Sequence, residues 1–223
     1  MHINGYRLWC ERSDPPLPAD FIPAMARRRL SKVARSMLTM MHELAAGDDA
    51  PVVYCSRHGD SDRVVNVLFD VAREEPLSPM GFSLSVHNAL MGQWSIANAS
   101  QSPMVAVSSG GRGYDGVFIE ADGFLQQGYE AVLVVMHASP MAPVYRENLA
   151  QSDVAGLPDW SRIIVLRLDK TLGDGSDLLT MDWCPHKKQT LCTAEAFDSL
   201  WRGLQKEKPG FDLGGWRFAN SAA

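Results

Sequence analysis

The feature of the sequence that most constrains the fold is a short apolar segment that leads directly into a glycine-rich turn. The segment, Met104-Val105-Ala106-Val107, has no alternation of apolar and polar residues, which predicts a parallel strand covered on both faces. The turn that follows is Ser108-Ser109-Gly110-Gly111-Arg112-Gly113. In α/β folds, ligands and reacting groups gather where the carboxyl end of a strand meets a helix N-terminus. At this position the chain offers glycines in place of an obvious nucleophile.

The rest of the chain alternates between apolar segments and segments of helical periodicity. Further strands are expected at 3–11, 51–55, 131–136 and 162–168. Helices are expected from about Pro23, over 64–71, as a buried helix after Phe82, over 114–127 and from about Thr193. For 210–218, a final edge strand and an unpaired tail both stay open. This alternation predicts an α/β fold with a mostly parallel five-stranded sheet and helices on both faces. Residues 1–223 are expected to form a single domain, with 159–223 as its C-terminal extension.

The composition is that of an ordinary globular protein, and it limits the classes of partner that the chain is expected to bind. Hydrophobic residues make up 46% of the 223 positions, and the formal net charge is −5. A chain with no overall basic field is not expected to bind nucleic acid. The four cysteines form no CxxC pair, which argues against a disulfide framework and a zinc site. Residues 1–14 contain no run of signal-peptide length and no segment is long enough for a membrane helix, so we expect a cytoplasmic protein.

One glycine pattern is typical of a nucleotide site but lacks the carboxylate that must accompany it. Residues 111–116, GRGYDG, match G-x-G-x-x-G after a predicted strand. A dinucleotide site also needs an acidic residue about 20 positions later to hold the ribose. That position falls near His137-Ala138-Ser139, which contains no acid. We therefore expect the glycines to serve close helix packing, and we expect no cofactor.

Two residues are alternative nucleophiles. Ser109 does not lie in a G-x-S-x-G motif, because Val107 stands two positions before it, and capping of the next helix is the simpler interpretation. Cys55 ends a predicted strand three residues before His58. This spacing leaves open a Cys-His pair formed through the turn and a buried structural cysteine. The histidines and acidic residues do not have the spacing of a known metal motif, so no metal site is predicted.

Three basic residues, Arg28, Lys32 and Arg35, recur on one side of the predicted first helix, opposite its apolar stripe. A solvated basic face is the common meaning of this pattern. The sharper hypothesis is a docking surface for an acidic partner.

The sequence around the organising segment resembles the N-terminal half of the β-ketoacyl synthases, and most closely the β-ketoacyl synthase-like N-terminal domain family. The resemblance rests on Ser85-Val86-His87-Asn88-Ala89, followed by Gly92, Ser95-Ile96 and 104–116. Supporting pieces lie at 25–32, 53–59 and 76–85. The resemblance covers about residues 21–145.

The resemblance implies a thiolase-like fold, in which the nucleophilic cysteine sits at a helix N-terminus in a T-A-C-x-x-G turn. Laid on this sequence, that turn places Gly110 at the cysteine position, and glycine has no side chain to carry an acyl thioester. The two catalytic histidines of the family lie in a second half that this chain is expected to lack. Neither His137 nor His186 lies in a matching motif. No catalytic residue is therefore predicted.

These departures resemble the non-catalytic partner of a type II ketosynthase, the chain-length factor, in the truncated form found in aryl polyene pathways. The implied role is to complete a heterodimer with a full-length ketosynthase and to shape the tunnel for the growing acyl chain. Contact with the acyl carrier protein is then assigned to Arg28, Lys32 and Arg35. The alternative function is a standalone acyltransferase or hydrolase that uses Ser109 or Cys55.

The resemblance also implies an interface. In thiolase-like dimers, the strand before the nucleophile position pairs with its mate across the twofold axis. Met104, Val105, Ala106 and Val107 are therefore expected at the interface, because an apolar strand edge is unfavourable in water. The helix that carries His87 and Asn88 is expected to contribute, although each of these two residues alone is more simply a hydrogen-bonded core residue.

Overall fold

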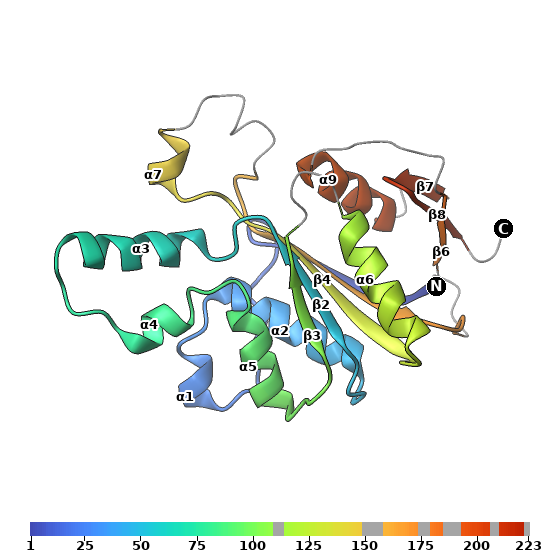
Figure 1. Cartoon of the computed structure of the whole chain (residues 1–223), viewed down its shortest axis with the longest axis horizontal. Helices are drawn as coiled ribbons and strands as arrows, with labels where there is room; N and C mark the ends of the chain where they lie inside the picture. The colour runs from blue at the N-terminus through green and yellow to red at the C-terminus, as the bar shows by residue number, and fades with distance from the viewer. Residues whose placement is uncertain (109–113, 149–157, 174–178, 185–192, 206–209, 221–223) are drawn as a thin grey trace.

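The computed structural model of the chain describes residues 1–108, 114–148, 158–173, 179–184, 193–205 and 210–220 (Figure 1). Its strands are β1 His2–Cys10, β2 Val52–Ser56, β3 Met104–Val107, β4 Ala131–Ala138, β5 Arg162–Asp169, β6 Leu179–Trp183, β7 Gly210–Leu213 and β8 Trp216–Asn220. They form one eight-stranded sheet in the order β3-β2-β4-β5-β1-β6-β8-β7. The α/β class is confirmed.

The predicted five-stranded, mostly parallel sheet is wrong, because the sheet is larger and mixed. β2 pairs in parallel with β3 and with β4, whereas the other pairings among the described residues are antiparallel. β1 lies between β5 and β6, so the first strand of the chain is remote from β2. The C-terminal segment adds three strands, and 210–218 forms the hairpin β7–β8 instead of one edge strand or a tail.

The helices are α1 Ala24–Arg27, α2 Lys32–Ala45, α3 Ser61–Ala72, α4 Pro79–Ser83, α5 Ala89–Asn98, α6 Asp115–Gln126, α7 Pro143–Arg146 and α9 Thr193–Leu204. The long helix predicted from Pro23 is in fact two helices. The second, α2, is capped by Ser31, whose Oγ accepts a hydrogen bond of 3.1 Å from the amide of Ala34. This side-chain cap satisfies one free amide of the first turn and starts a new helix there.

Helices cover both faces of the sheet, as predicted (Figure 1). The core under α6 and α9 contains Val132, Val134 and Met136 of β4. The core under α2 and α5 contains Leu133 and Val135 of the same strand. Successive residues of a strand point to opposite faces, so an unbroken apolar strand is one that is buried on both sides.

β3 departs from this pattern because it is the edge strand next to β2. Ala106 is exposed, and Met104, Val105 and Val107 are half-buried. The prediction that this strand is covered on both faces is therefore wrong for the isolated chain. Beyond the carboxyl ends of β2 and β4, α3 and α4 extend away from the sheet (Figure 1).

Candidate functional site

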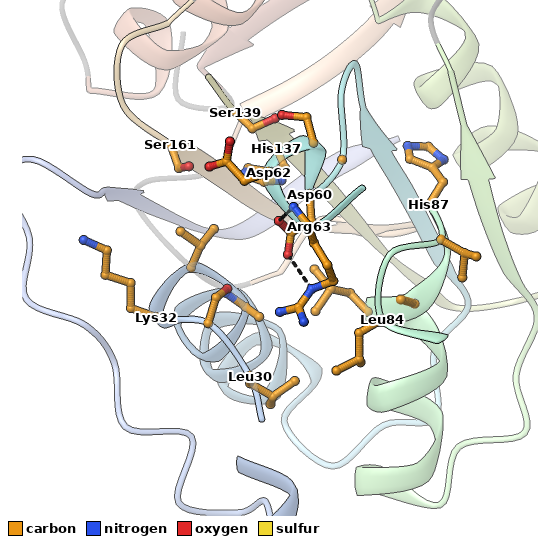
Figure 2. Close-up of a pocket in the computed structure, with 18 of the residues that line it drawn as sticks. Leu30, Lys32, Asp60, Asp62, Arg63, Leu84, His87, His137, Ser139 and Ser161 are labelled. Carbon is orange, nitrogen blue, oxygen red and sulfur yellow. Dashed lines mark hydrogen bonds and ion pairs between the residues drawn. The ribbon is translucent and has the colours of Figure 1, made fainter. Parts of the chain in front are cut away.

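A cavity of about 240 Å³ lies at the carboxyl ends of β2 and β4. The start of α2, the start of α3 and the segment leading into α5 surround it (Figure 2). The carboxyl end of parallel strands is where open α/β sheets place ligands, because the strands end there and the loops diverge. This cavity is therefore the candidate functional site of the described residues.

The polar end of the cavity is built by residues at core positions of the sheet. Ser56 of β2 and Ile163 of β5 flank His137 of β4 in the strand register. By alternation, His137 shares a face with Leu133 and Val135, which pack under α2. On this face of the sheet, the last residue pair of β2 and β4, Ser56 and His137, is therefore polar, and it lies beside the cavity.

His137 is 6% exposed, and neither ring nitrogen has a hydrogen-bond partner among the described residues. Burial lowers the pKa of His137 to about 4, although Asp60 and Glu11 oppose the shift. The imidazole is therefore neutral at pH 7, with one donor and one acceptor nitrogen. Ser139, 7% exposed, lies close by, and its Oγ also lacks a partner within the described chain (Figure 2).

An aromatic pair forms another side of the cavity. The rings of Tyr54 and His87 lie 5.3 Å apart, and His87 Nε2 is 3.0 Å from the carbonyl oxygen of Ser56. Burial raises the pKa of Tyr54, so its hydroxyl stays protonated. The turn below them is fixed by a 2.9 Å bond from the amide of Gly59 to Ser56 Oγ.

The charged residues around the cavity are arranged in pairs. Lys32 Nζ lies 2.8 Å from Glu11 Oε1. Arg63 Nε lies 3.1 Å from Asp60 Oδ2 (Figure 2). Burial favours the protonated form of Glu11, but hydrogen bonds from Lys32 and Ser161 outweigh it and lower the pKa of this carboxyl. These pairs leave little net charge near the cavity.

The structure places His87 beside the cavity and Asn88 at the start of α5, where its side chain makes no capping bond. Both residues are exposed. Their interpretation as core residues is wrong, and neither lies within the helix proper, since α5 begins at Ala89.

The three basic residues do not share one helix face. Arg28 is exposed at the end of α1, whereas Lys32 and Arg35 lie on α2. Lys32 is engaged by Glu11. Arg35 is half-buried, so these residues form no continuous basic stripe.

Cys55 lies in the core under α6, completely buried, on the face of the sheet opposite to Ser56 and the cavity. A nucleophilic cysteine needs access for its substrate, so this burial favours the structural interpretation of Cys55. Ser109 and Gly110 lie outside the described residues. The described part of the turn shows only that β3 precedes it and that α6 follows it.

Sequence reasoning missed Tyr54, His137 and Ser139 as residues of the site. One signal was available for His137: it continues the face of Leu133 and Val135 in an otherwise apolar strand. A polar residue at a core position is more informative than an apolar one. Ser139 and Tyr54 carry no comparable signal.

In the ranges that the structure describes, groups of three or more acidic, histidine or cysteine side chains arranged to hold a metal ion are absent. Among the same residues, every helix is too short or too polar to cross a membrane.

Comparison with known families identifies the fold. A model of the β-ketoacyl synthase N-terminal domain matches residues 4–194. The chain belongs to this family. No curated protein sequence matches the chain.

Solved structures agree with this ketosynthase assignment. The chain is similar to one chain of the ketosynthase ApeO in complex with its chain length factor ApeC from Xenorhabdus doucetiae, with 23% identity and a TM-score of 0.69. The match covers 93% of this chain and 84% of that one. The ishigamide ketosynthase/chain length factor matches with 13% identity and a TM-score of 0.50, covering 82% of this chain and 56% of that one. These likenesses establish a thiolase-like ketosynthase fold.

A third similar structure is AntDE:AntF, a type II polyketide acyl-carrier protein in complex with its ketosynthase. The identity is 14% and the TM-score 0.50, and the match covers 75% of this chain and 56% of that one. This ketosynthase-like chain thus spans little more than half the length of the second and third relatives.

Proposed function

We propose that this ketosynthase-like chain is a non-catalytic chain-length factor. It pairs with an active β-ketoacyl synthase in type II chain elongation of the polyketide, fatty-acid-like or aryl polyene kind. In the heterodimer it shapes the tunnel that receives the growing acyl chain. Membership of the family establishes the fold of the chain. The proposal concerns the role of the chain in chain elongation.

The observation that carries the proposal is the residue at the nucleophile position of the family. The turn between β3 and α6 has Gly110 where the ketosynthase motif has cysteine. Glycine has no side-chain atom that can attack a thioester, so an acyl chain cannot be held covalently at this position. Cys55 does not replace it, because its side chain is buried under α6.

The exposed edge of the sheet supports the pairing. Among the described residues, no strand pairs with the outer side of β3, and the sequence of β3 contains no charged residue or proline. Such an edge is a template for another strand. His87 and Asn88 are exposed nearby in sequence, so we assign them with β3 to the partner interface. The names of the ApeO–ApeC and ishigamide structures, both ketosynthase/chain length factor pairs, support the proposal that this chain pairs with a ketosynthase.

An acylation experiment tests the non-catalytic role. The purified chain is incubated with malonyl- and octanoyl-loaded carrier protein and its intact mass is measured. We expect no covalent adduct. An adduct that disappears in Ser109→Ala or Cys55→Ala would instead establish the alternative, a standalone acyltransferase or hydrolase. A full-length ketosynthase in the same assay is the positive control.

The pairing is tested separately by co-expression with a full-length ketosynthase of a type II system. We expect the two chains to elute together from size-exclusion chromatography at a 1:1 ratio. A homodimer that the ketosynthase does not displace would contradict the proposed heterodimer without affecting the acylation result.

A further inference from the structure

The cavity next to His137 contains buried polar groups that the fold does not use. His137 and Ser139 are both more than nine-tenths buried, and their polar side-chain atoms lack partners among the described residues. A buried polar group without a hydrogen bond costs about 1–3 kcal/mol. A folded protein keeps such groups where something else satisfies them or where they have a function. Both residues line the same cavity, so one ligand can form hydrogen bonds with both of them.

We propose that this cavity binds a small, neutral and mostly apolar molecule or chain end that carries one hydroxyl or carbonyl group. The polar group of the ligand lies against His137 and Ser139, and the apolar body lies between α2 and α5. The neutral imidazole offers one donor and one acceptor, and the serine hydroxyl offers both. A hydroxyl group on the ligand can therefore be bonded from two sides.

The rest of the lining fits an apolar body. Leu30 and Val33 approach from α2 and its N-terminal flank, and Leu84, Val86 and Leu90 approach from the segment around α5. Binding sites of small molecules commonly combine such an apolar wall with a few polar groups that fix the orientation.

The size of the cavity limits the ligand. An apolar cavity of about 150 Å³ in another protein accepts benzene. The 240 Å³ of this cavity therefore accommodates one ring, or a short chain, with one or two substituents. Tyr54 and His87 provide ring faces along the wall.

The charges around the cavity exclude a strongly ionic ligand. The lining contains three basic residues, Arg29, Lys32 and Arg63, and three acidic residues, Glu11, Asp60 and Asp62. Two of the acids are engaged by Lys32 and Arg63. A phosphate or carboxylate site needs an excess of cations or converging donors, which this lining does not offer.

Two probes that differ only in a hydroxyl group test the site: 4-methylphenol and toluene. Their dissociation constants for the full chain are measured by NMR titration at pH 7. We expect 4-methylphenol to bind about tenfold more tightly than toluene, as one or two net hydrogen bonds provide. The site does not rest on the proposed pairing with a ketosynthase, so failure to form a heterodimer leaves this expectation unchanged.

Two variants assign the preference to the buried groups. His137→Leu removes both ring nitrogens, and Ser139→Ala removes one hydroxyl. We expect His137→Leu and Ser139→Ala each to reduce the tenfold preference about threefold, because each removes about half of the hydrogen-bonding contribution. The matched control is Ser83→Ala, an exposed serine of α4 whose Oγ bonds only to the carbonyl of Met80 within the described chain. If His137→Leu fails to fold by circular dichroism, Ser139→Ala alone decides.

Three results overturn the proposal: neither probe binds, both bind equally well, or the preference is undiminished in both variants. A carrier protein loaded with 8-hydroxyoctanoate separates the two sources of the ligand. Displacement of 4-methylphenol supports a carrier-bound chain end, and the absence of displacement supports a free molecule.

Discussion

The two parts of the sheet differ in how completely the chain covers them. In the antiparallel part, β5-β1-β6-β8-β7, aromatic side chains pack on one another. Trp216 and Phe218 of β8 each lie 5.8 Å from the ring of Phe118 of α6, and Phe218 stacks on Phe211 at 4.4 Å. The outer strand β7 carries Asp212, whose ion pair with Arg217 measures 3.3 Å. A charge on an edge strand discourages further pairing.

The parallel part, β3-β2-β4, ends in an edge without such protection. Most of the exposed large apolar side chains lie close in sequence to this part: Leu68, Phe69, Val71, Leu77, Met80, Phe82, Val86, Ile96 and Ile119. Five of these side chains lie on α3 and α4, which contact each other, and exposed apolar surface gathered in this way is typical of an interaction site. The antiparallel part of the sheet is thus covered by side chains of the same chain. Contacts with another protein are expected at the parallel part.

The largest effect on stability is expected in the buried aromatic core between α6 and β8. Phe118 of α6 is fully buried and joins the helix to β8. Phe118→Ala removes this packing and leaves a cavity, so we expect a loss of about 3–5 kcal/mol in the free energy of unfolding. Urea denaturation followed by circular dichroism measures it. The control Phe69→Ala, in exposed α3, should change stability by no more than about 0.5 kcal/mol; equal losses would contradict the comparison.

The next effect concerns pH and the polar end of the parallel part. The pKa of His137 is about 4 in the folded chain because of burial, against about 6.5 in the unfolded chain. Between these values the unfolded state binds the additional proton, so the stability falls as the pH falls from about 6.5 to 4. The full difference corresponds to about 3 kcal/mol.

Comparison with His137→Leu isolates this contribution, because the pKa values of His58 and His2 are lowered as well. We expect the variant to lose stability less steeply than the natural chain between pH 6.5 and 4 in urea titrations. Identical slopes for His137→Leu and the natural chain would mean that His137 is not held neutral by burial.

The sequence predicted the parallel part better than the antiparallel part, for physical reasons. Runs such as Val132–Met136 are apolar at every position, and this pattern directly reports burial on both faces. The position of β1 between β5 and β6 depends on long-range pairing, which no local pattern encodes. For 210–218 the sequence left one edge strand and a tail open, because no local pattern shows that this segment folds back on itself as the hairpin β7–β8.

The candidate site was predicted only in part. His87 was singled out through the family resemblance as an interface residue, which stays a prediction; its place in the lining of the cavity was not predicted. His137 and Ser139 come into the same cavity because two strands end side by side and a turn follows, a juxtaposition that depends on the register. The local pattern of β3 did not predict the exposure of Ala106, because an apolar strand at an edge has the same local sequence as one in the middle; only the family resemblance indicated an edge.

A smaller effect is expected at the edge strand. Ala106→Asp places a charge on the exposed side of β3, where the isolated chain tolerates it. If β3 pairs with the partner subunit, the buried charge should weaken the heterodimer at least 30-fold, or about 2 kcal/mol. Analytical ultracentrifugation with the co-expressed ketosynthase measures the change. Leu172→Asp adds the same charge at an exposed apolar residue after β5 and should leave the affinity unchanged; equal affinity in both variants would remove β3 from the interface.

The smallest effect separates a helix that the core holds from one that it does not. Ser31 and Ser78 cap α2 and α4 in the same way, each Oγ accepting a 3.1 Å bond from the amide three residues on. α2 has a fully buried face, whereas no residue of α4 is buried. Because a cap contributes to global stability only if its helix unfolds with the core, Ser31→Ala should cost about 1 kcal/mol and Ser78→Ala close to nothing. Urea denaturation of both variants measures the difference, and a loss of equal size in Ser78→Ala would show that α4 unfolds together with the sheet.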